Sequence, residues 1–462
     1  MGYASVAQRI PCTAGYDPRP MRRLCSLIAV ALLLSSCRLP IQRGRWNVVV
    51  VVVDTLRADR LGAYGYGRGT SPSFDALAGE SYLFTDARAQ ASCTFPSVNS
   101  LLTSRYPARF LGQPGGGFGI PTGMPSLAEV LQARGWSTAA VSASAVVRQT
   151  PTRFNPTDGF ARGFERFDEE CLWRGAACVT NHGIAATARL REPFFLYLHY
   201  IDPHGPYDPP QPFRKQFRIG RTQQPWLLHG DPAPIARTLE GGPRVTWTPR
   251  ELRFLQGLYD GEVAYVDAQL AKLVDELRKK GLLQRTILVV LSDHGESFLE
   301  HGAVRHCGTV FDSEVKTPLL LRLPRQRRGE KVAGAVENLD VVPTLVDLLG
   351  LPAEGQGFEG RSLLPRLDGK AGGERYAFSM AKRWRSVADD RYKLVTELGT
   401  DHWQLFDLRR DAGERRDVKG EAKEAFERLR KVLQEQLART EKPEVTRDAA
   451  EADARLRALG YL

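Results

Sequence analysis

The chain has 462 residues, of which 42% are hydrophobic and 25% charged, with a formal net charge of +11. This charge is modest for the size, and the basic residues are scattered apart from one dense patch at 322–331. We find no zinc-finger spacing, helix-turn-helix or aromatic stacking motif. The sequence therefore argues against a nucleic acid partner.

Residues 1–36 have the pattern of a lipoprotein-type signal peptide that starts at Met21. A basic Met21-Arg22-Arg23 precedes the apolar stretch 24–34, and small residues lead to Cys37. The stretch is shorter than the ~20 residues a membrane-spanning helix needs. Its ending resembles the bacterial lipoprotein cleavage box. That resemblance implies a lipid anchor at Cys37 and an exported protein on the periplasmic or cell-surface side of a bacterial membrane.

Four further cysteines follow Cys37, namely Cys93, Cys171, Cys178 and Cys307. An oxidising periplasm permits a disulfide between Cys171 and Cys178, which would close a small loop. Cys93 and Cys307 both lie beside candidate site residues. The sequence leaves open whether those two pair or stay free.

The first predicted element is a strand made of six consecutive valines, residues 48–53, which ends in Asp54. A continuous β-branched run of this kind is typical of a strand buried on both faces of a parallel sheet. Ligands of open α/β sheets bind beyond the carboxyl ends of such strands. We therefore predict that Asp54 is a ligand or catalytic group.

A helix is expected next at 72–80 and another at 96–104, and the segment before the second helix carries a candidate nucleophile. The sequence there is Thr94-Phe95-Pro96-Ser97. Pro96 suits the first position of a helix, which would put Thr94 just before it. Free N–H groups at a helix N-terminus favour a bound phosphate or sulfate. A threonine hydroxyl beside a divalent metal can act as a nucleophile, although an ordinary N-cap threonine fits the same pattern.

Further along, the sequence predicts a helix at 126–134, strands at 137–143 and 193–201, and a long helix at 250–280. Between them, residues 206–250 are predicted to form a surface excursion over the site. Strands that alternate with helices predict an α/β fold, with a mostly parallel central sheet flanked by helices.

The late strand at 286–291 ends in a second chemically rich segment, which contains Asp293, His294 and Glu296. One aspartate alone would suit a helix cap or an ion pair. Two strand-end acids with an adjacent histidine favour a metal site assembled across the sheet. Carboxylates plus one imidazole favour Mn, Zn or Fe-type ions over the pure oxygen cage of calcium.

The character of the sequence changes after about residue 370. Short alternating strands are predicted at 391–395 and 403–408, followed by a charged helix at 414–439. We predict a catalytic domain at 45–370 and a small antiparallel C-terminal subdomain with a charged helical tail at 371–462.

Six motifs together resemble a sulfatase-type member of the alkaline phosphatase superfamily, and they occur in the order of that family over most of residues 45–420. They are Val53-Asp54-Thr55-Leu56-Arg57-Ala58-Asp59, Pro72-Ser73-Phe74-Asp75-Ala76-Leu77-Ala78, Thr94-Phe95-Pro96-Ser97 with Leu101-Leu102-Thr103-Ser104-Arg105-Tyr106-Pro107, Leu198-His199-Tyr200-Ile201-Asp202-Pro203-His204-Gly205-Pro206-Tyr207, Ser292-Asp293-His294-Gly295-Glu296 and Arg391-Tyr392-Lys393-Leu394. Each motif alone is weak evidence, whereas six in the family's order are specific.

The resemblance implies a metal-dependent hydrolase of sulfate or phosphate esters. Asp54, Asp293 and His294 take the positions of ligands to one divalent ion (Mn, Zn, Ca or Mg), and Thr94 takes the nucleophile position beside the metal.

Three further residues are assigned to the substrate. His204 resembles the histidine that contacts the anionic group or the leaving oxygen, and His306 falls near a position where sulfatases keep a lysine. Both histidines are therefore candidates for catalysis and substrate binding, and Arg57 is a candidate for binding. The expected partner is an anionic ester, which can be a glycan, a lipid or a small molecule.

The departures from the sulfatase pattern keep more than one function open. Thr94 stands where sulfatases have the cysteine or serine that becomes formylglycine, and Cys93 is one residue out of register. Val98 replaces an arginine and Thr55 replaces an aspartate. The threonine resembles the branch that transfers phosphoethanolamine or glycerol phosphate. A sulfatase modified at Cys93 and a non-catalytic lipoprotein that binds an anionic glycan are also compatible with the sequence.

Overall fold

The computed structural model describes residues 41–111, 119–121, 123–150, 159–353, 355–370 and 373–440. The predicted signal peptide at 1–36 and the anchor Cys37 lie outside these residues. From Gln42 on, the described residues belong to one compact unit. Within the described ranges, no helix has the length and apolar character that a membrane crossing requires.

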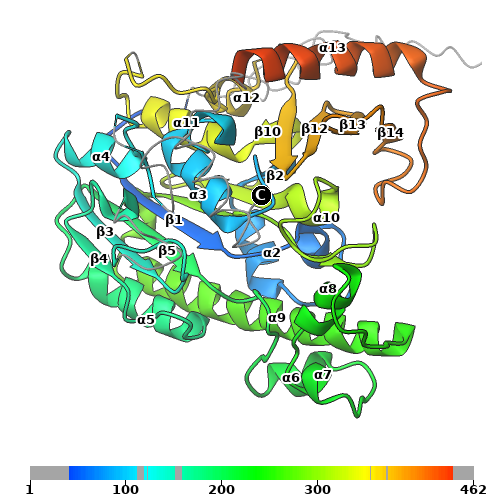
Figure 1. Cartoon of the computed structure of the whole chain (residues 1–462). Coiled ribbons are helices and arrows are strands. Elements are labelled where there is room, and N and C mark those ends of the chain that lie inside the picture. The colour runs from blue at the N-terminus through cyan, green and yellow to red at the C-terminus, as the bar shows by residue number, and fades with distance from the viewer. Residues whose placement is uncertain are drawn as a thin grey trace, which may run out of the picture. The chain divides into compact units, whose positions relative to one another are not determined.

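An eight-stranded sheet forms the core of the fold (Figure 1), and all of its pairings are parallel except those made by β9. From one edge to the other the strands are β10 (Glu330–Glu337), β2 (Tyr82–Arg88), β9 (Lys316–Arg322), β6 (Thr286–Ser292), β1 (Asn47–Val53), β5 (Phe194–Tyr200), β3 (Ser137–Ser142) and β4 (Arg166–Asp168). The predicted mostly parallel α/β fold is confirmed.

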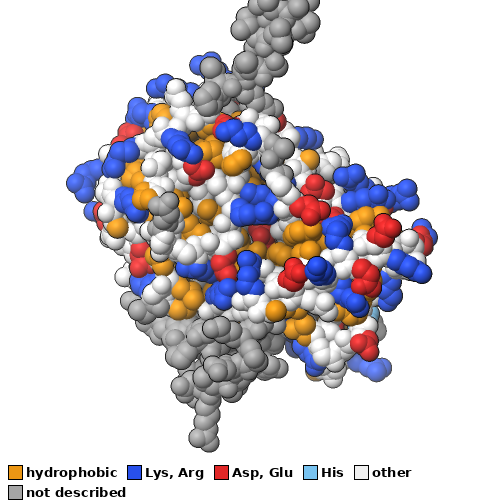
Figure 2. Space-filling view, turned by 90° about the horizontal axis from the view of Figure 1, so that it is seen from above, with side chains coloured by type: hydrophobic (Ala, Val, Ile, Leu, Met, Phe, Trp, Pro, Cys, Tyr) orange, Lys and Arg blue, Asp and Glu red, His pale blue; other side chains and the backbone are white. Residues whose placement is uncertain are grey.

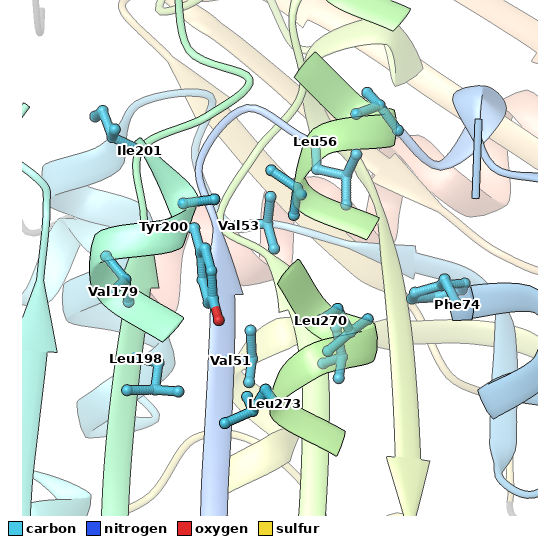
Figure 3. Close-up of a cluster of buried hydrophobic side chains, with 14 of the residues drawn as sticks. Val51, Val53, Leu56, Phe74, Val179, Leu198, Tyr200, Ile201, Leu270 and Leu273 are labelled. Carbon is cyan, nitrogen blue, oxygen red and sulfur yellow. The ribbon is translucent and has the colours of Figure 1, made fainter. Parts of the chain in front are cut away.

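The valine run forms the central strand β1, which pairs with β5 on one side and β6 on the other. All seven of its residues are buried. Val49, Val51 and Val53 belong to one buried cluster with Leu270 and Leu273 of α9, and Figure 3 shows Val51 and Val53 of this cluster near the two leucines. Burying a side chain of this size contributes about 1.5–3 kcal/mol. The strand is thus fixed in the place from which Asp54 emerges.

Helices cover both faces of this sheet. One face carries α2 (Pro72–Ala78), α5 (Ala176–Thr187) and α9 (Pro249–Lys279), and the other carries α3 (Thr94–Thr103), α4 (Leu127–Gln132) and α11 (Val341–Leu348) (Figure 1). The long helix α9 starts with a capping box between Thr248 and Glu251, and Gly281, in the left-handed region, follows its end.

Shorter elements complete the described part of this region. They are α6 (Phe213–Phe217), α7 (Pro225–Leu228), α8 (Ala233–Leu239), the hairpin of β7 (Ser297–Phe298) and β8 (Val304–Arg305), α10 (Asp312–Val315), α12 (Leu364–Leu367) and six 3-10 turns at Ala58–Arg60, Gly62–Tyr64, Pro107–Arg109, Gly159–Ala161, Leu283–Arg285 and Asn338–Asp340. The predicted excursion at 206–250 therefore contains three short helices.

A second, four-stranded antiparallel sheet follows in the C-terminal part. It consists of β11 (Ala377–Ala381), β12 (Trp384–Ala388), β13 (Tyr392–Glu397) and β14 (Trp403–Asp407), and α13 (Lys423–Thr440) packs on it through Leu429 and Leu433. The prediction that this helix begins at residue 414 is wrong. Glu414 has a left-handed backbone and a buried side chain, so its segment forms a turn instead.

Charged side chains of both signs lie on the face shown in Figure 2. Lys and Arg side chains are interspersed there with Asp, Glu and apolar groups over the part of the face that is described.

A buried ion-pair network links the two sheets. Lys393 of β13 is fully buried and contacts Asp312 at 2.6 Å and Glu414 at 2.8 Å. Arg88 of β2 makes a two-pronged contact with the same Asp312, at 2.9 and 2.7 Å. Because each charge is desolvated, the network is stable only when every partner is present.

We expect Lys393→Met to destabilise the fold by about 3–5 kcal/mol, because it leaves two buried carboxylates without their shared cation. Equilibrium unfolding in urea measures the loss, and Lys423→Met, at an exposed lysine of α13, is the matched control. A loss for Lys393→Met no larger than that of the control would contradict the network's role.

Candidate active site

Three buried side chains meet at the carboxyl edge of the large sheet. Val53 of β1 is in register with Ser292 of β6, so the next residues, Asp54 and Asp293, emerge side by side. One ligand atom each from Asp54, Asp293 and His294 lies within 4.8 Å of the others, and all three residues are buried. The structure thus brings together the predicted metal ligands from chain segments far apart in sequence.

Backbone groups hold the Asp293 carboxylate in place. Its Oδ1 accepts hydrogen bonds from the backbone N–H groups of Thr55 at 3.1 Å and His294 at 2.8 Å. Thr55 has φ 56°, an uncommon conformation for a β-branched residue, and it turns the chain sharply after β1. The Asp293 carboxylate is thus held at the turn that follows β1.

The donor set fits a divalent cation. Asp54 Oδ1 and Asp293 Oδ2 are buried and have no hydrogen-bond partner in the described residues. Burial and the Asp293 carboxylate together raise the pKa of Asp54 well above its ordinary value. Two buried carboxylates with free oxygens beside an imidazole are costly unless a cation joins them.

Thr94 lies next to this cluster, with its Oγ1 3.1 Å from His294 Nε2. It is the first residue of α3, and Cys93 occupies the N-cap position without a capping hydrogen bond from its side chain. The expectation that Pro96 opens the helix is therefore wrong by two residues. Proline is tolerated at this third position because the first N–H groups of a helix have no intrahelical acceptor.

The two other predicted histidines extend the site in a row of rings. The ring centroids of His294 and His306 are 4.6 Å apart, and those of His306 and His204 are 5.0 Å apart. His306 Nδ1 is 3.1 Å from Glu296 Oε1, and His204 Nδ1 is 2.7 Å from the Gly205 carbonyl oxygen. These partners orient both rings.

The environment raises the pKa of one of these three histidines and lowers the pKa of the other two. Burial opposes the charged form of His294, yet the Asp293 and Asp54 carboxylates outweigh it and raise its pKa. Burial and the adjacent His306 lower the pKa of His204 to about 3. Burial and His294 also lower the pKa of His306.

Arg57 lies at the base of the site in an ion-pair network. Its guanidinium donates to both Asp59 oxygens at 2.8 and 2.7 Å, to Glu300 at 2.6 Å and to the Glu296 carbonyl at 2.8 Å. In this structure Arg57 fixes the loop after β1 to the segment after β6. Its assignment to substrate binding stays a prediction.

Two residues near the site were given no role from the sequence. His199 of β5 is fully buried, with Nε2 3.4 Å from Asp54 Oδ2 and Nδ1 2.8 Å from the Tyr197 hydroxyl. Glu296 orients His306, as described above. The only signal for His199 is a histidine inside an otherwise apolar strand, which a buried structural histidine would give as well.

Both pairs of cysteines form disulfides. Cys171 pairs with Cys178, as the sequence permits, and Cys93 pairs with Cys307, a pairing that the sequence alone does not decide. The second bridge joins the residue before Thr94 to the residue after His306. The Cys307 N–H also donates to the Ser92 carbonyl at 2.8 Å. The start of α3 and the histidine loop are thus covalently coupled.

A family model described as "Sulfatase" matches residues 46–351, which is more than half of the chain. The chain belongs to the sulfatase family. A second model, "N-sulphoglucosamine sulphohydrolase, C-terminal", matches residues 300–443. The chain is thus placed among hydrolases of sulfate and related esters.

Curated sulfatase relatives are distant. An arylsulfatase from Clostridium perfringens is 22% identical over 458 residues, covering 85% of this chain and 94% of that protein. Arylsulfatase K from Danio rerio is 30% identical over 195 residues, which span 39% of this chain and only 37% of that protein.

Solved sulfatase-like structures share the fold. The phosphonate monoester hydrolase of Agrobacterium radiobacter superposes with a TM-score of 0.67 at 23% identity, covering 86% of this chain and 95% of its own. A structure in complex with its substrate D-glucosamine-2-N,6-O-disulfate superposes with a TM-score of 0.68 at 18% identity. The match covers 87% of this chain and 99% of that chain. At these identities the likeness establishes the fold alone.

If the Cys93–Cys307 disulfide positions Thr94 against His306, the double variant Cys93→Ala/Cys307→Ala should lower kcat for a simple ester. We expect a loss of roughly tenfold to a hundredfold, because small displacements of reacting groups are costly. Steady-state kinetics on p-nitrophenyl phosphate and sulfate measure the change.

The matched control is Cys171→Ala/Cys178→Ala, which removes the other disulfide. An equal loss of kcat in both double variants would show that general destabilisation, and not coupling of Thr94 to His306, is responsible. Circular dichroism melting of both variants separates the two causes.

Proposed function

We propose that the protein is a metal-dependent hydrolase of anionic sulfate or phosphate esters that uses Thr94 as its nucleophile. The observation that carries the proposal is the approach of the Thr94 hydroxyl to within 3.1 Å of His294, beside Asp54 and Asp293. Asp54, Asp293 and His294 would hold the cation. When bound, it would favour the deprotonated hydroxyl and stabilise charge on the transferred group.

The reaction then needs one covalent step and its reversal by water. The Thr94 hydroxyl loses its proton to solvent, and its oxygen bonds to the phosphorus or sulfur atom while the bond to the alcohol oxygen breaks. The departing oxygen takes a proton from Nε2 of His306, which for this step must carry its second proton beside Glu296 against the burial that lowers its pKa. Water next attacks the threonine ester and returns a proton to His306, and the freed Thr94 oxygen regains a proton from solvent.

Glu296 supports the assignment of the proton carrier to His306. The contact between His306 Nδ1 and Glu296 Oε1 leaves Nε2 as the ring atom that exchanges a proton. A carboxylate behind an imidazole fixes its tautomer and stabilises the imidazolium. His204, 5.0 Å away between ring centroids, would contact the anionic group.

The cysteine arrangement favours Thr94 over a modified Cys93. The Cys93 sulfur is bonded to Cys307, so no thiol is available for oxidation to an aldehyde. Peptide mass analysis tests this directly. An aldehyde at Cys93 would replace the Thr94 mechanism with that of a formylglycine sulfatase.

Two other functions share this geometry. A transferase would pass the group from Thr94 to an acceptor alcohol instead of water, and a binding protein would hold an anionic glycan without turnover. The free carboxylate oxygens of Asp54 and Asp293 favour an enzyme, since simple binding of an anion has no use for them. A lipid anchor at Cys37 would hold the hydrolase at a membrane surface, and globomycin-sensitive processing with palmitate labelling tests that part.

Removal of the Thr94 hydroxyl is the central test. Thr94→Ala should lower hydrolysis of phosphate monoesters, diesters and sulfate esters by at least about a thousandfold, because no nucleophile remains. Thr94→Ser, which keeps the hydroxyl, is the matched control and should retain most of the rate. If Thr94→Ala keeps its metal and still hydrolyses these esters at nearly the rate of the unmodified protein, this mechanism is wrong.

Metal removal gives an independent prediction. Purified protein should contain about one equivalent of a divalent ion, and chelation should abolish hydrolysis and lower the Tm, because ligand binding to the native state stabilises it. Asp293→Asn should lose the metal. Full activity after chelation, checked by elemental analysis, would show that no cation takes part.

A further inference from the structure

One aromatic side chain beside the site is exposed to solvent. Trp173 is 58% exposed, and the described residues contain only two other large exposed hydrophobic side chains, Leu228 and Leu239. Its ring centroid is 5.9 Å from that of His204. Trp173 therefore lies at the outer end of the row of rings that leads through His204 and His306 to His294.

The loop around Trp173 holds the ring in this exposed place. Cys171, which is fully buried, and Cys178 close the loop by a disulfide. The backbone N–H of Trp173 donates a hydrogen bond of 3.1 Å to the backbone carbonyl of Ala143, the residue just after β3. The loop is thus fastened to the same carboxyl edge of the sheet that carries Asp54 and Asp293.

The backbone of Trp173 is itself unfavourable for a large residue. Its φ of 54° lies in the left-handed region, where glycine and asparagine are common and bulky residues are rare. A tryptophan in this position costs conformational energy and gains little from burial. Such a combination beside a reactive cluster indicates that the ring acts on a ligand.

We propose that Trp173 is a specificity residue that stacks against the apolar face of a sugar ring, so that the substrate is a sulfated or phosphorylated saccharide. This inference rests on the proposed function. A pyranose presents C–H groups on one face, which an indole ring attracts, while its hydroxyls stay in water around an exposed side chain. The ester group of the same sugar would point along the histidines toward Thr94.

The test compares saccharide esters with a small ester that cannot reach Trp173. Glucosamine sulfates substituted at N2, O3 or O6 and the matching phosphates form the saccharide set, and ethyl sulfate and ethyl phosphate form the small set. Trp173→Gly should lower the ratio of kcat/KM between saccharide and ethyl esters by about tenfold, the scale of one aromatic stacking contact. The loss should lie in KM.

Two measurements keep structural effects apart from recognition. Trp173→Gly should melt no lower than the parent, because glycine suits the left-handed backbone. Trp173→Phe keeps an aromatic face and should recover part of the ratio. A change in folding alone would move the Tm without changing the preference for saccharides.

The outcomes distinguish this inference from the proposed function. Turnover of ethyl esters but of no saccharide ester, or an unchanged ratio in Trp173→Gly, overturns the inference and leaves the hydrolase standing. An equal KM increase for phenyl esters overturns the sugar assignment in favour of an aryl group. No turnover of any ester by the parent overturns the proposed function and the inference with it.

Discussion

The site depends on the pairing of β1 with β6. Because the two strands are parallel and Val53 is in register with Ser292, the acids that follow them must emerge together. A shift of one residue would turn the valine side chains to the opposite faces and separate Asp54 from Asp293. The valine packing that fixes this register is therefore also what assembles two carboxylates at one point.

That assembly is electrostatically unfavourable by itself, and the surroundings are arranged to offset it. Backbone N–H groups from Thr55 and His294 neutralise one oxygen of Asp293, and His199 lies against one oxygen of Asp54. The remaining oxygen of each acid is buried without a hydrogen bond from the described residues and faces His294 Nε2, at 3.4 Å from Asp293 Oδ2 and 3.9 Å from Asp54 Oδ1. These contacts offset only part of the negative charge, which is the reason for proposing a cation at this point.

The sequence predicts the two central strands and the side chains at their ends well. It predicts the contacts between the loops around them poorly. Apolar runs reveal β1 and β6, and the acids at their ends identify Asp54, Asp293 and His294, because those signals are local. The Cys93–Cys307 bridge and the Glu296–His306 contact depend on how loops fold over the sheet. No local pattern encodes such pairings.

The C-terminal part shows the same limit. Alternating residues predict β13 and β14, yet Lys393 gives no sign in sequence that it is fully buried between Asp312 and Glu414. Charged residues are normally expected on the surface. A run of charged residues resembles an exposed helix. The sequence therefore places the start of α13 at Glu414, which in the structure lies in a turn.

The departures from the sulfatase pattern change where substrate affinity arises. With Val98 in place of an arginine, the site has one cationic group fewer to hold an anionic ester, and with Thr55 in place of an aspartate it has one carboxylate fewer to hold a cation. His204, His306 and the N-terminus of α3 remain, and these bind an anion less strongly than a guanidinium. Affinity must then come from the rest of the substrate. Contacts remote from the reacting bond can supply it and still assist the chemistry, because binding energy there can be used to align the ester with the proposed nucleophile, Thr94.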